Sequence, residues 1–225
     1  MKKIIILISL IIIITLIIMY LNKNTIKYIK VATTNENKIN EVNNETKIKI
    51  YFPNTNYKVL NKEIKKVIYN NLSEFKTSLK EQNNLPYQYY TLFITYDEYK
   101  YQEYISIVFY IETFIGGAHP SHDIKTINYN IDKNKIITIE DIYEKNKNIL
   151  NKFSIYSREK LLKEEKYSDN NIKSMLLEGT KPTLDNFKNF SYTEDGFKIY
   201  FNYYQIAPYY YGSSVIAVPY NYINN

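Results

Sequence analysis

The most apolar stretch of the chain lies near its beginning and contains no charged residue. It runs from Ile4 to Leu21, and only Ser9 and Thr15 interrupt it. At about 1.5 Å per residue, a helix of about 18 residues is about 27 Å long, close to the hydrocarbon thickness of a bilayer, about 30 Å. No small residues of the A-x-A type follow the run. We therefore expect an uncleaved signal-anchor, a transmembrane helix over residues 1–21 that is inserted through residues 4–21, rather than a removable signal peptide.

The charges around this apolar run give no clear orientation. Two lysines precede it and three follow it closely, so the positive-inside rule favours neither side. A very short basic leader before an apolar core is typical of exported chains. We expect a single-pass protein of the cell membrane with its C-terminal part outside the cytoplasm, and a tail facing the cytoplasm is the alternative.

Residues 22–45 show no apolar periodicity. They are rich in Asn, Lys, Thr and Glu and contain neither Gly nor Pro. Such a composition buries too little apolar surface to fold alone, which predicts a polar stalk between the membrane and a folded part.

The folded part begins with a change from alternating to helical periodicity. Residues 47–52 alternate as a half-buried strand does, and Pro53 is expected to end it. Residues 62–82 then place apolar side chains on one stripe of a 3.6-residue helix, with Asn61 as a candidate N-cap. The stripe consists of Ile64, Val67, Ile68, Leu72, Phe75 and Leu79.

Two further strands complete a first unit over residues 46–115. They are predicted at 89–96 and 104–114. The second of them is apolar at almost every position, as expected of a central strand that is covered on both faces. The first unit is therefore a strand, a helix and two strands.

The second unit, residues 116–225, contains one strand, a helical region and three more strands. The strand is predicted at 125–131 and the helical region at 139–178. The last strands are predicted at 190–193, 197–201 and 214–219, with an Asp-Gly turn between the first two. Helices interleaved with antiparallel strands indicate an α+β fold: after the transmembrane helix, two small units of mainly antiparallel sheet packed with helices, meeting near Gly116.

Composition excludes several kinds of site. The 225 residues contain no cysteine, so disulfides, thiolate metal sites and lipidation at cysteine are impossible. The formal net charge is +6, yet Arg158 is the only arginine. Readers of phosphates and base edges favour the guanidinium fork, so we expect no nucleic acid among the partners.

The segment after residue 115 holds both histidines of the chain. It reads Gly116-Gly117-Ala118-His119-Pro120-Ser121-His122-Asp123. His119, His122 and Asp123 are the candidate catalytic residues if the protein is an enzyme, since two imidazoles and a carboxylate could hold a metal. The spacing matches neither the His-Glu-x-x-His pattern nor that of metal-dependent deacetylases. The alternative is structural: the two glycines form a tight corner that His119 and Pro120 fix by packing.

A tyrosine-rich loop is the second candidate site. It reads Tyr203-Tyr204-Gln205-Ile206-Ala207-Pro208-Tyr209-Tyr210-Tyr211-Gly212. Such a loop can be an aromatic platform for sugar rings or for a partner protein, or it can close the core with its aromatic side chains. The candidate binding residues of the two segments are Gly116, Gly117, His119, Pro120, Tyr204, Pro208, Tyr209, Tyr210 and Tyr211. No cofactor or metal is expected.

These motifs together resemble a known pair of domains. The matching segments are 115–120, 128–132, 139–143, 196–201, 204–209 and 218–220. In this order they resemble the extracytoplasmic domain pair of RsiV-type anti-sigma factors and PdaC-type peptidoglycan deacetylases, over residues 46–222. The GGAHP motif marks a domain of unknown function in that family rather than an active site.

The resemblance implies a binding role. Three residues precede the apolar run, too few for a sigma-binding segment, and the chain ends at Asn225 without a catalytic deacetylase domain. In RsiV-type members the pair recognises host lysozyme. We therefore expect a non-enzymatic, membrane-anchored binding or sensing module for a cell-envelope ligand, either a lysozyme-like protein or peptidoglycan glycan. A metal-assisted hydrolase or deacetylase using His119 and His122 is the alternative.

Overall fold

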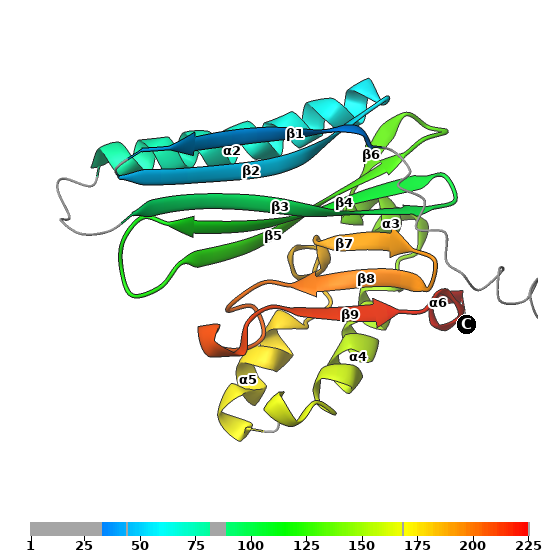
Figure 1. Ribbon diagram of the computed structural model, residues 1–225. Coiled ribbons are helices and arrows are strands. Elements are labelled where there is room, and N and C mark those ends of the chain that lie inside the picture. The colour runs from blue at the N-terminus through cyan, green and yellow to red at the C-terminus, as the bar shows by residue number, and fades with distance from the viewer. Residues whose placement is uncertain (1–32, 44, 82–88, 168, 225) are drawn as a thin grey trace, which may run out of the picture. The chain divides into compact units, whose positions relative to one another are not determined.

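The computed structural model describes residues 33–43, 45–81, 89–167 and 169–224 (Figure 1). The chain divides by its contacts into residues 1–31 and 32–225, and all described residues belong to the second unit. The predicted transmembrane helix over residues 1–21 lies outside the described residues. Within the described ranges, no helix combines the length and apolar character needed to cross a bilayer.

A six-stranded sheet forms the first half of this unit. Its strands are β1 (Thr33–Val42), β2 (Thr46–Thr55), β3 (Tyr90–Tyr101), β4 (Tyr104–Phe114), β5 (Ser121–Asn130) and β6 (Lys135–Ile137), in this order across the sheet. The helix α2 (Lys58–Glu81) connects β2 and β3, which are therefore parallel, and all other neighbours are antiparallel.

The helix α2 covers one face of this sheet, as its periodicity predicts. Leu60, Ile64, Ile68 and Phe75 are buried in one core with side chains of β2, β3 and β4. The prediction of Asn61 as the N-cap is wrong, because the helix begins at Lys58. The Asn61 side chain instead ties the first turn to the end of β2, where its Nδ2 donates to the carbonyl of Thr55 and its Oδ1 accepts from the N–H of Thr55.

Part of the predicted stalk is a strand. Within residues 22–45, residues 33–42 form β1, which pairs with β2 along its whole length. Backbone hydrogen bonds hold such an edge strand, so it needs no apolar alternation. Two side chains of β1 also contact the rest of the unit. Ile39 packs against the core beneath α2, and Glu41 Oε2 lies 3.0 Å from the ammonium of Lys76 in α2.

Pro53 does not end β2, which continues to Thr55. The pairing of β2 with β3 extends only to Ile50, so Pro53 lies where the strand has a partner on one side. A proline without an N–H is tolerated at such a position.

The predicted boundary near Gly116 falls inside the first sheet. β5 pairs with β4 from Ser121 to Asn130, and β6 adds a further strand up to Ile137. The second sheet begins later and consists of β7 (Phe190–Thr193), β8 (Gly196–Phe201) and β9 (Ser214–Val218). The glycine corner is therefore a connection between two neighbouring strands.

β4 is covered on both faces, as predicted. Ile105, Ile107 and Phe109 belong to the core beneath α2, whereas Val108 packs with Tyr200 of the second sheet. Hydrogen bonds also join the two sheets: Asn128 Nδ2 donates to the carbonyl of Phe190 and the N–H of Tyr192 donates to Ser106 Oγ.

The predicted helical region consists of three helices. They are α3 (Ile139–Lys145), α4 (Ile149–Leu161) and α5 (Asn170–Gly179), and the chain closes with α6 (Tyr220–Asn224). Short 3-10 turns lie at Glu165–Tyr167, Asp185–Phe187 and Tyr209–Tyr211. Phe153 of α4 packs on Phe187 and Phe197 in the core of the second sheet. The chain thus has the predicted mixed α+β architecture.

Candidate functional site

The connection from β4 to β5 is the glycine corner. Gly116 and Gly117 have φ of 99° and 105°, which side chains rarely adopt. A Cβ at Gly117 would meet no atom within 4 Å, so the backbone conformation rather than space requires glycine there. The corner places His119 on the surface, with its Nδ1 2.9 Å from the carbonyl of Pro120.

His119 does not pack into the corner. Its ring stacks on Tyr209 with centroids 3.7 Å apart, and His122 stacks on Tyr203 at 4.6 Å. The ring centroid of Tyr209 in turn lies 5.1 Å from that of Tyr203 and 5.8 Å from that of Tyr204. We call these five side chains the ring cluster: His119, His122, Tyr203, Tyr204 and Tyr209. The two candidate segments of the sequence thus form one surface.

Tyr204 is the strained member of the ring cluster. Its φ is 63°, a left-handed conformation that is an outlier for a bulky residue. The turn that contains it closes with the N–H of Gln205 donating to the carbonyl of Asn202. The side chain is 54% exposed, and its Oη lies 3.4 Å from His119 Nε2. Residues held in such conformations gather at functional sites.

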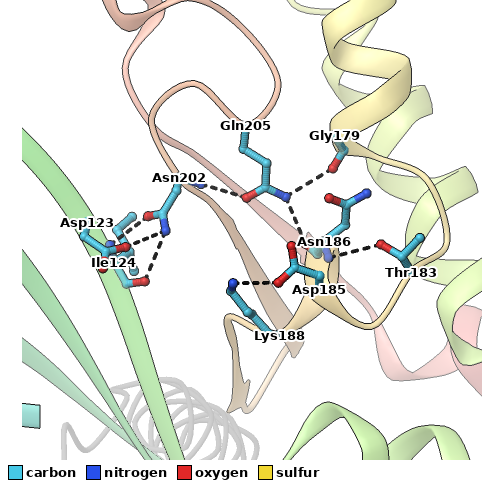
Figure 2. A network of polar contacts seen from close by, with 9 residues as sticks. All are labelled: Asp123, Ile124, Gly179, Thr183, Asp185, Asn186, Lys188, Asn202 and Gln205. Atoms are coloured by element: carbon cyan, nitrogen blue, oxygen red, sulfur yellow. Dashed lines mark hydrogen bonds and ion pairs between the residues drawn. The ribbon is translucent and has the colours of Figure 1, made fainter.

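Asn202 connects the tyrosine loop to β5 (Figure 2). Among the residues that the structure describes, β6 pairs only with residues 128–130 of β5, so near Ile124 the strand has β4 as its only strand partner. Asn202 Oδ1 accepts from the N–H of Ile124 at 2.7 Å, and Nδ2 donates to Asp123 Oδ1 at 2.6 Å. The Asn202 side chain therefore takes the hydrogen-bonding place of a neighbouring strand on β5, next to the ring cluster.

Gln205 connects the same loop to the end of α5 (Figure 2). Its Oε1 accepts from the N–H of Asn202, and its Nε2 donates to the carbonyls of Gly179 and Asn186. A Cβ on Gly179 would lie 1.9 Å from the carbonyl oxygen of Gln205. Any residue with a side chain at the last position of α5 would clash with the backbone of the tyrosine loop, so the loop conformation requires a glycine there.

Carboxylates lie next to the rings. Glu112 Oε2 is 3.9 Å from His122 Nδ1, and Asp123 Oδ2 is 3.5 Å from the ammonium of Lys125. Partial burial raises the pKa of Tyr209, and the nearby Tyr203 and Glu112 raise it further. Tyr209 therefore stays a neutral phenol at physiological pH.

The arrangement does not form a metal site in the part of the chain that the structure describes. No three His, Asp or Glu side chains there gather closely enough to hold an ion. Of the three candidate ligands, His119 and His122 stack on different tyrosines, and Asp123 accepts a hydrogen bond from Asn202.

The other sequence candidates lie at the edge of the ring cluster or outside it. Pro208 is exposed just before the 3-10 turn, and Tyr210 is 93% exposed. Tyr211 points to the core, where it packs against Tyr167. Tyr203 was part of the tyrosine motif but not among the candidate binding residues. Asn202 directly precedes that motif and Gln205 lies within it, but neither was among the candidate binding residues.

The fold and this surface belong to a chain that joins two known domains. Residues 23–122 match the family model described as Deacetylase PdaC, and residues 140–221 match the one described as Protein of unknown function (DUF3298). The comparison confirms the resemblance to a PdaC-type domain pair. His119 and His122 lie within the first match and the three tyrosines of the ring cluster within the second, so the cluster forms where the two domains meet.

One curated relative is the peptidoglycan-N-acetylmuramic acid deacetylase PdaC of Bacillus subtilis (strain 168). The two sequences are 35% identical over 114 residues, which are 51% of this chain and 24% of the relative. The chain thus matches about a quarter of the length of that protein.

Two solved structures share the fold. A DUF3298 family protein from Pseudomonas aeruginosa PAO1 superposes with a TM-score of 0.66 at 13% identity and covers 84% of this chain and 92% of its own. A member of the same family from Bacteroides fragilis NCTC 9343 gives a TM-score of 0.57 at 16% identity, with 85% and 91% covered. At these identities the likeness concerns the fold alone.

Proposed function

We propose that the chain is a cell-envelope binding module that holds peptidoglycan glycan on the ring cluster. Sugar rings present C–H faces that stack on aromatic side chains, and tyrosine offers large contact area at low entropic cost. The name of the Bacillus subtilis relative, a peptidoglycan deacetylase, supports this class of ligand.

The observation that carries the proposal is the ring cluster itself. Tyr204 is more than half exposed, and it holds its ring beside His119 and Tyr209 in a strained conformation. The network around Asn202 and Gln205 holds its neighbours in place. A preorganised, exposed aromatic surface costs little ordering entropy when a ligand binds.

The proposal includes a location and the absence of catalysis. The apolar run at residues 4–21 would anchor the module in the cell membrane, with the folded part outside the cytoplasm, where it can meet the wall. The module would bind without cleaving or deacetylating its ligand. Proteolysis of the folded part on intact cells tests the location, and acetate release from the bound glycan tests the absence of deacetylation.

Co-sedimentation with purified peptidoglycan sacculi tests the binding. The full chain in detergent micelles is expected to sediment with sacculi at micromolar concentration, and Tyr204→Ala combined with Tyr209→Ala is expected to reduce the bound fraction severalfold. Tyr69→Ala is the matched control, since Tyr69 is 52% exposed on α2, outside the ring cluster.

Two results would overturn the proposal. Equal sedimentation of the double variant and the wild type would remove the ring cluster from binding. Retention on immobilised lysozyme with no retention on sacculi would make a protein, and not a glycan, the ligand.

A further inference from the structure

A small cavity lies beside the ring cluster, at the ends of three strands. Its volume is about 260 Å³, less than the range of about 300–1,000 Å³ that is usual for drug-sized ligands. It is lined by Phe93, Thr95, Tyr110, Ile111, Glu112, His122, Asp123, Ile124, Tyr203 and Ser213. We call it the Glu112 cavity. His122 and Tyr203 belong both to this lining and to the ring cluster, so the two surfaces are continuous.

The charge of the cavity is opposite to that of the whole chain. The chain has a formal net charge of +6, yet the described residues that line the cavity include two carboxylates and neither lysine nor arginine. Asp123 is engaged with Asn202 and with Lys125. Glu112 Oε2 lies 3.9 Å from His122 Nδ1, beyond hydrogen-bond distance, and the Glu112 side chain is 38% exposed. Glu112 can therefore accept an external cation.

Aromatic side chains surround this carboxylate. In the register of the sheet, Glu112 of β4 lies opposite Phe93 of β3 and opposite His122 of β5. Tyr110 lines the same cavity, and its Oη donates to Asp97 at 2.9 Å, which fixes the ring. Faces of phenyl and phenol rings attract cations. Phe93 already faces the ammonium of Lys47, which lies 5.7 Å from its ring centroid, so an external ammonium would meet the ring of Tyr110 beside the carboxylate.

We propose that the Glu112 cavity binds the ammonium group of a de-N-acetylated amino sugar, while the ring cluster stacks the adjoining part of the glycan. This inference rests on the proposed function and names the chemistry of its ligand. A glycan fits better than a lysine side chain of a protein, because the continuous ring cluster offers a flat aromatic surface for sugars next to the cation site. An N-acetyl group is neutral, so it would form no ion pair with Glu112.

Titration calorimetry with the full chain in detergent micelles tests the inference. The probes are a glucosamine tetramer and an N-acetylglucosamine tetramer, at about pH 7. We expect the glucosamine tetramer to bind about tenfold more tightly, the gain of one partly exposed charge-assisted contact. Glu112→Gln should remove that preference.

Glu144→Gln is the matched control. It changes the net charge by the same amount, and Glu144 lies in α3 and does not line the cavity. Thermal unfolding of both variants shows whether each is folded. Equal affinity for the two tetramers, or an unchanged preference in a folded Glu112→Gln variant, would refute the inference. A lysine methyl ester that binds as tightly as the glucosamine tetramer would also refute it, since an amine alone would then suffice.

The two proposals fail in different ways. If sacculi retain the full chain but the glucosamine tetramer has no advantage, the Glu112 inference is wrong and the proposed function stands. If neither sacculi nor tetramers bind, both are wrong.

Discussion

Tyr204 adopts a conformation that is costly for a bulky residue. A side chain in a sparsely populated region of φ and ψ costs about 1–3 kcal/mol, and the rest of the fold must supply that energy. In return, the turn from Asn202 to Gln205 presents the ring beside His119 and Tyr209. Under the proposed function, this strain holds the ring where a ligand could contact it.

This view predicts opposite effects of Tyr204→Gly on stability and binding. Glycine adopts a φ of 63° without strain, so the variant should unfold at the same temperature as the wild type or a higher one, with a gain of up to about 1 kcal/mol. Its retention on sacculi should fall severalfold, because a ring of the cluster is lost. Tyr204→Phe is the control, since it keeps the ring and the strain. A clear loss of stability in Tyr204→Gly would mean that packing of the ring outweighs the strain.

The residues of the site could be predicted from the sequence better than their contacts. Both histidines and the tyrosine loop stood out as motifs, and the positive φ of Gly116 and Gly117 followed from the glycine pair. The stacking of His119 on Tyr209 did not, because it joins residues 90 positions apart. Asn202 gave no signal, since one asparagine among many becomes specific only when β5 lies beside it.

Among the elements, α3 shows how a polar side chain defines a helix start. The Asp141 carboxylate accepts from the N–H of Thr138 at 3.0 Å and lies 2.7 Å from the ammonium of Lys135. The pKa of Asp141 is lowered, first by its hydrogen bond with Lys135 and then by that with the Thr138 backbone. The folded state therefore favours the ionised carboxylate.

A pH dependence follows from this lowered pKa. Because the folded pKa lies below the unfolded value of about 3.9, the contribution of Asp141 is fully present above that value and is lost as the pH falls through the folded pKa. Asp141→Asn should lower the free energy of unfolding by about 1 kcal/mol at neutral pH, and the difference should vanish in strong acid. Urea unfolding of both proteins across this pH range measures it. In Glu144→Gln, which removes an exposed pair with Lys147, the change should stay below about 0.5 kcal/mol. A difference between Asp141→Asn and wild type that is independent of pH would contradict the assignment.

Elements with a buried side were predictable, and elements held by the backbone were not. The stripe of α2 and the apolar run of β4 both reflect burial, and both were found in the sequence. β1 was taken for stalk because its ladder with β2 leaves no pattern in its side chains. The N-terminal turn of α2 was misplaced because Asn61 binds the strand before it rather than capping the helix.

At the scale of the whole described unit, a buried polar link joins the two sheets. Ser106 Oγ donates to Asn128 Oδ1 at 2.5 Å and accepts from the N–H of Tyr192, and Asn128 Nδ2 donates to the carbonyl of Phe190. Ser106 and Asn128 are both at most 2% exposed. The bond between Ser106 and Asn128 lies within the first sheet, but Asn128 Nδ2, the carbonyl of Phe190 and the N–H of Tyr192 would lose these partners if the sheets separated slightly. The link therefore favours unfolding of both sheets together.

Asn128→Ala is therefore expected to destabilise the protein by about 2–3 kcal/mol, because it leaves the carbonyl of Phe190 without this donor and the Ser106 hydroxyl without this acceptor. Unfolding followed by both tyrosine fluorescence and circular dichroism should remain one transition in the wild type. Asn151→Ala, at an exposed position of α4, should change stability little. A wild type in which the two probes show separate transitions would show that the sheets unfold independently.

Arg158 offers a last consequence. It is the only arginine of the chain, and its guanidinium donates to Thr180 Oγ1 and to the carbonyls of Leu177 and Thr180, at the C-terminal end of α5. Several acceptors at this helix end lie in different directions and suit a planar fork, which lysine cannot supply. The one guanidinium of the chain is thus engaged within the fold, where it joins α4 to the end of α5.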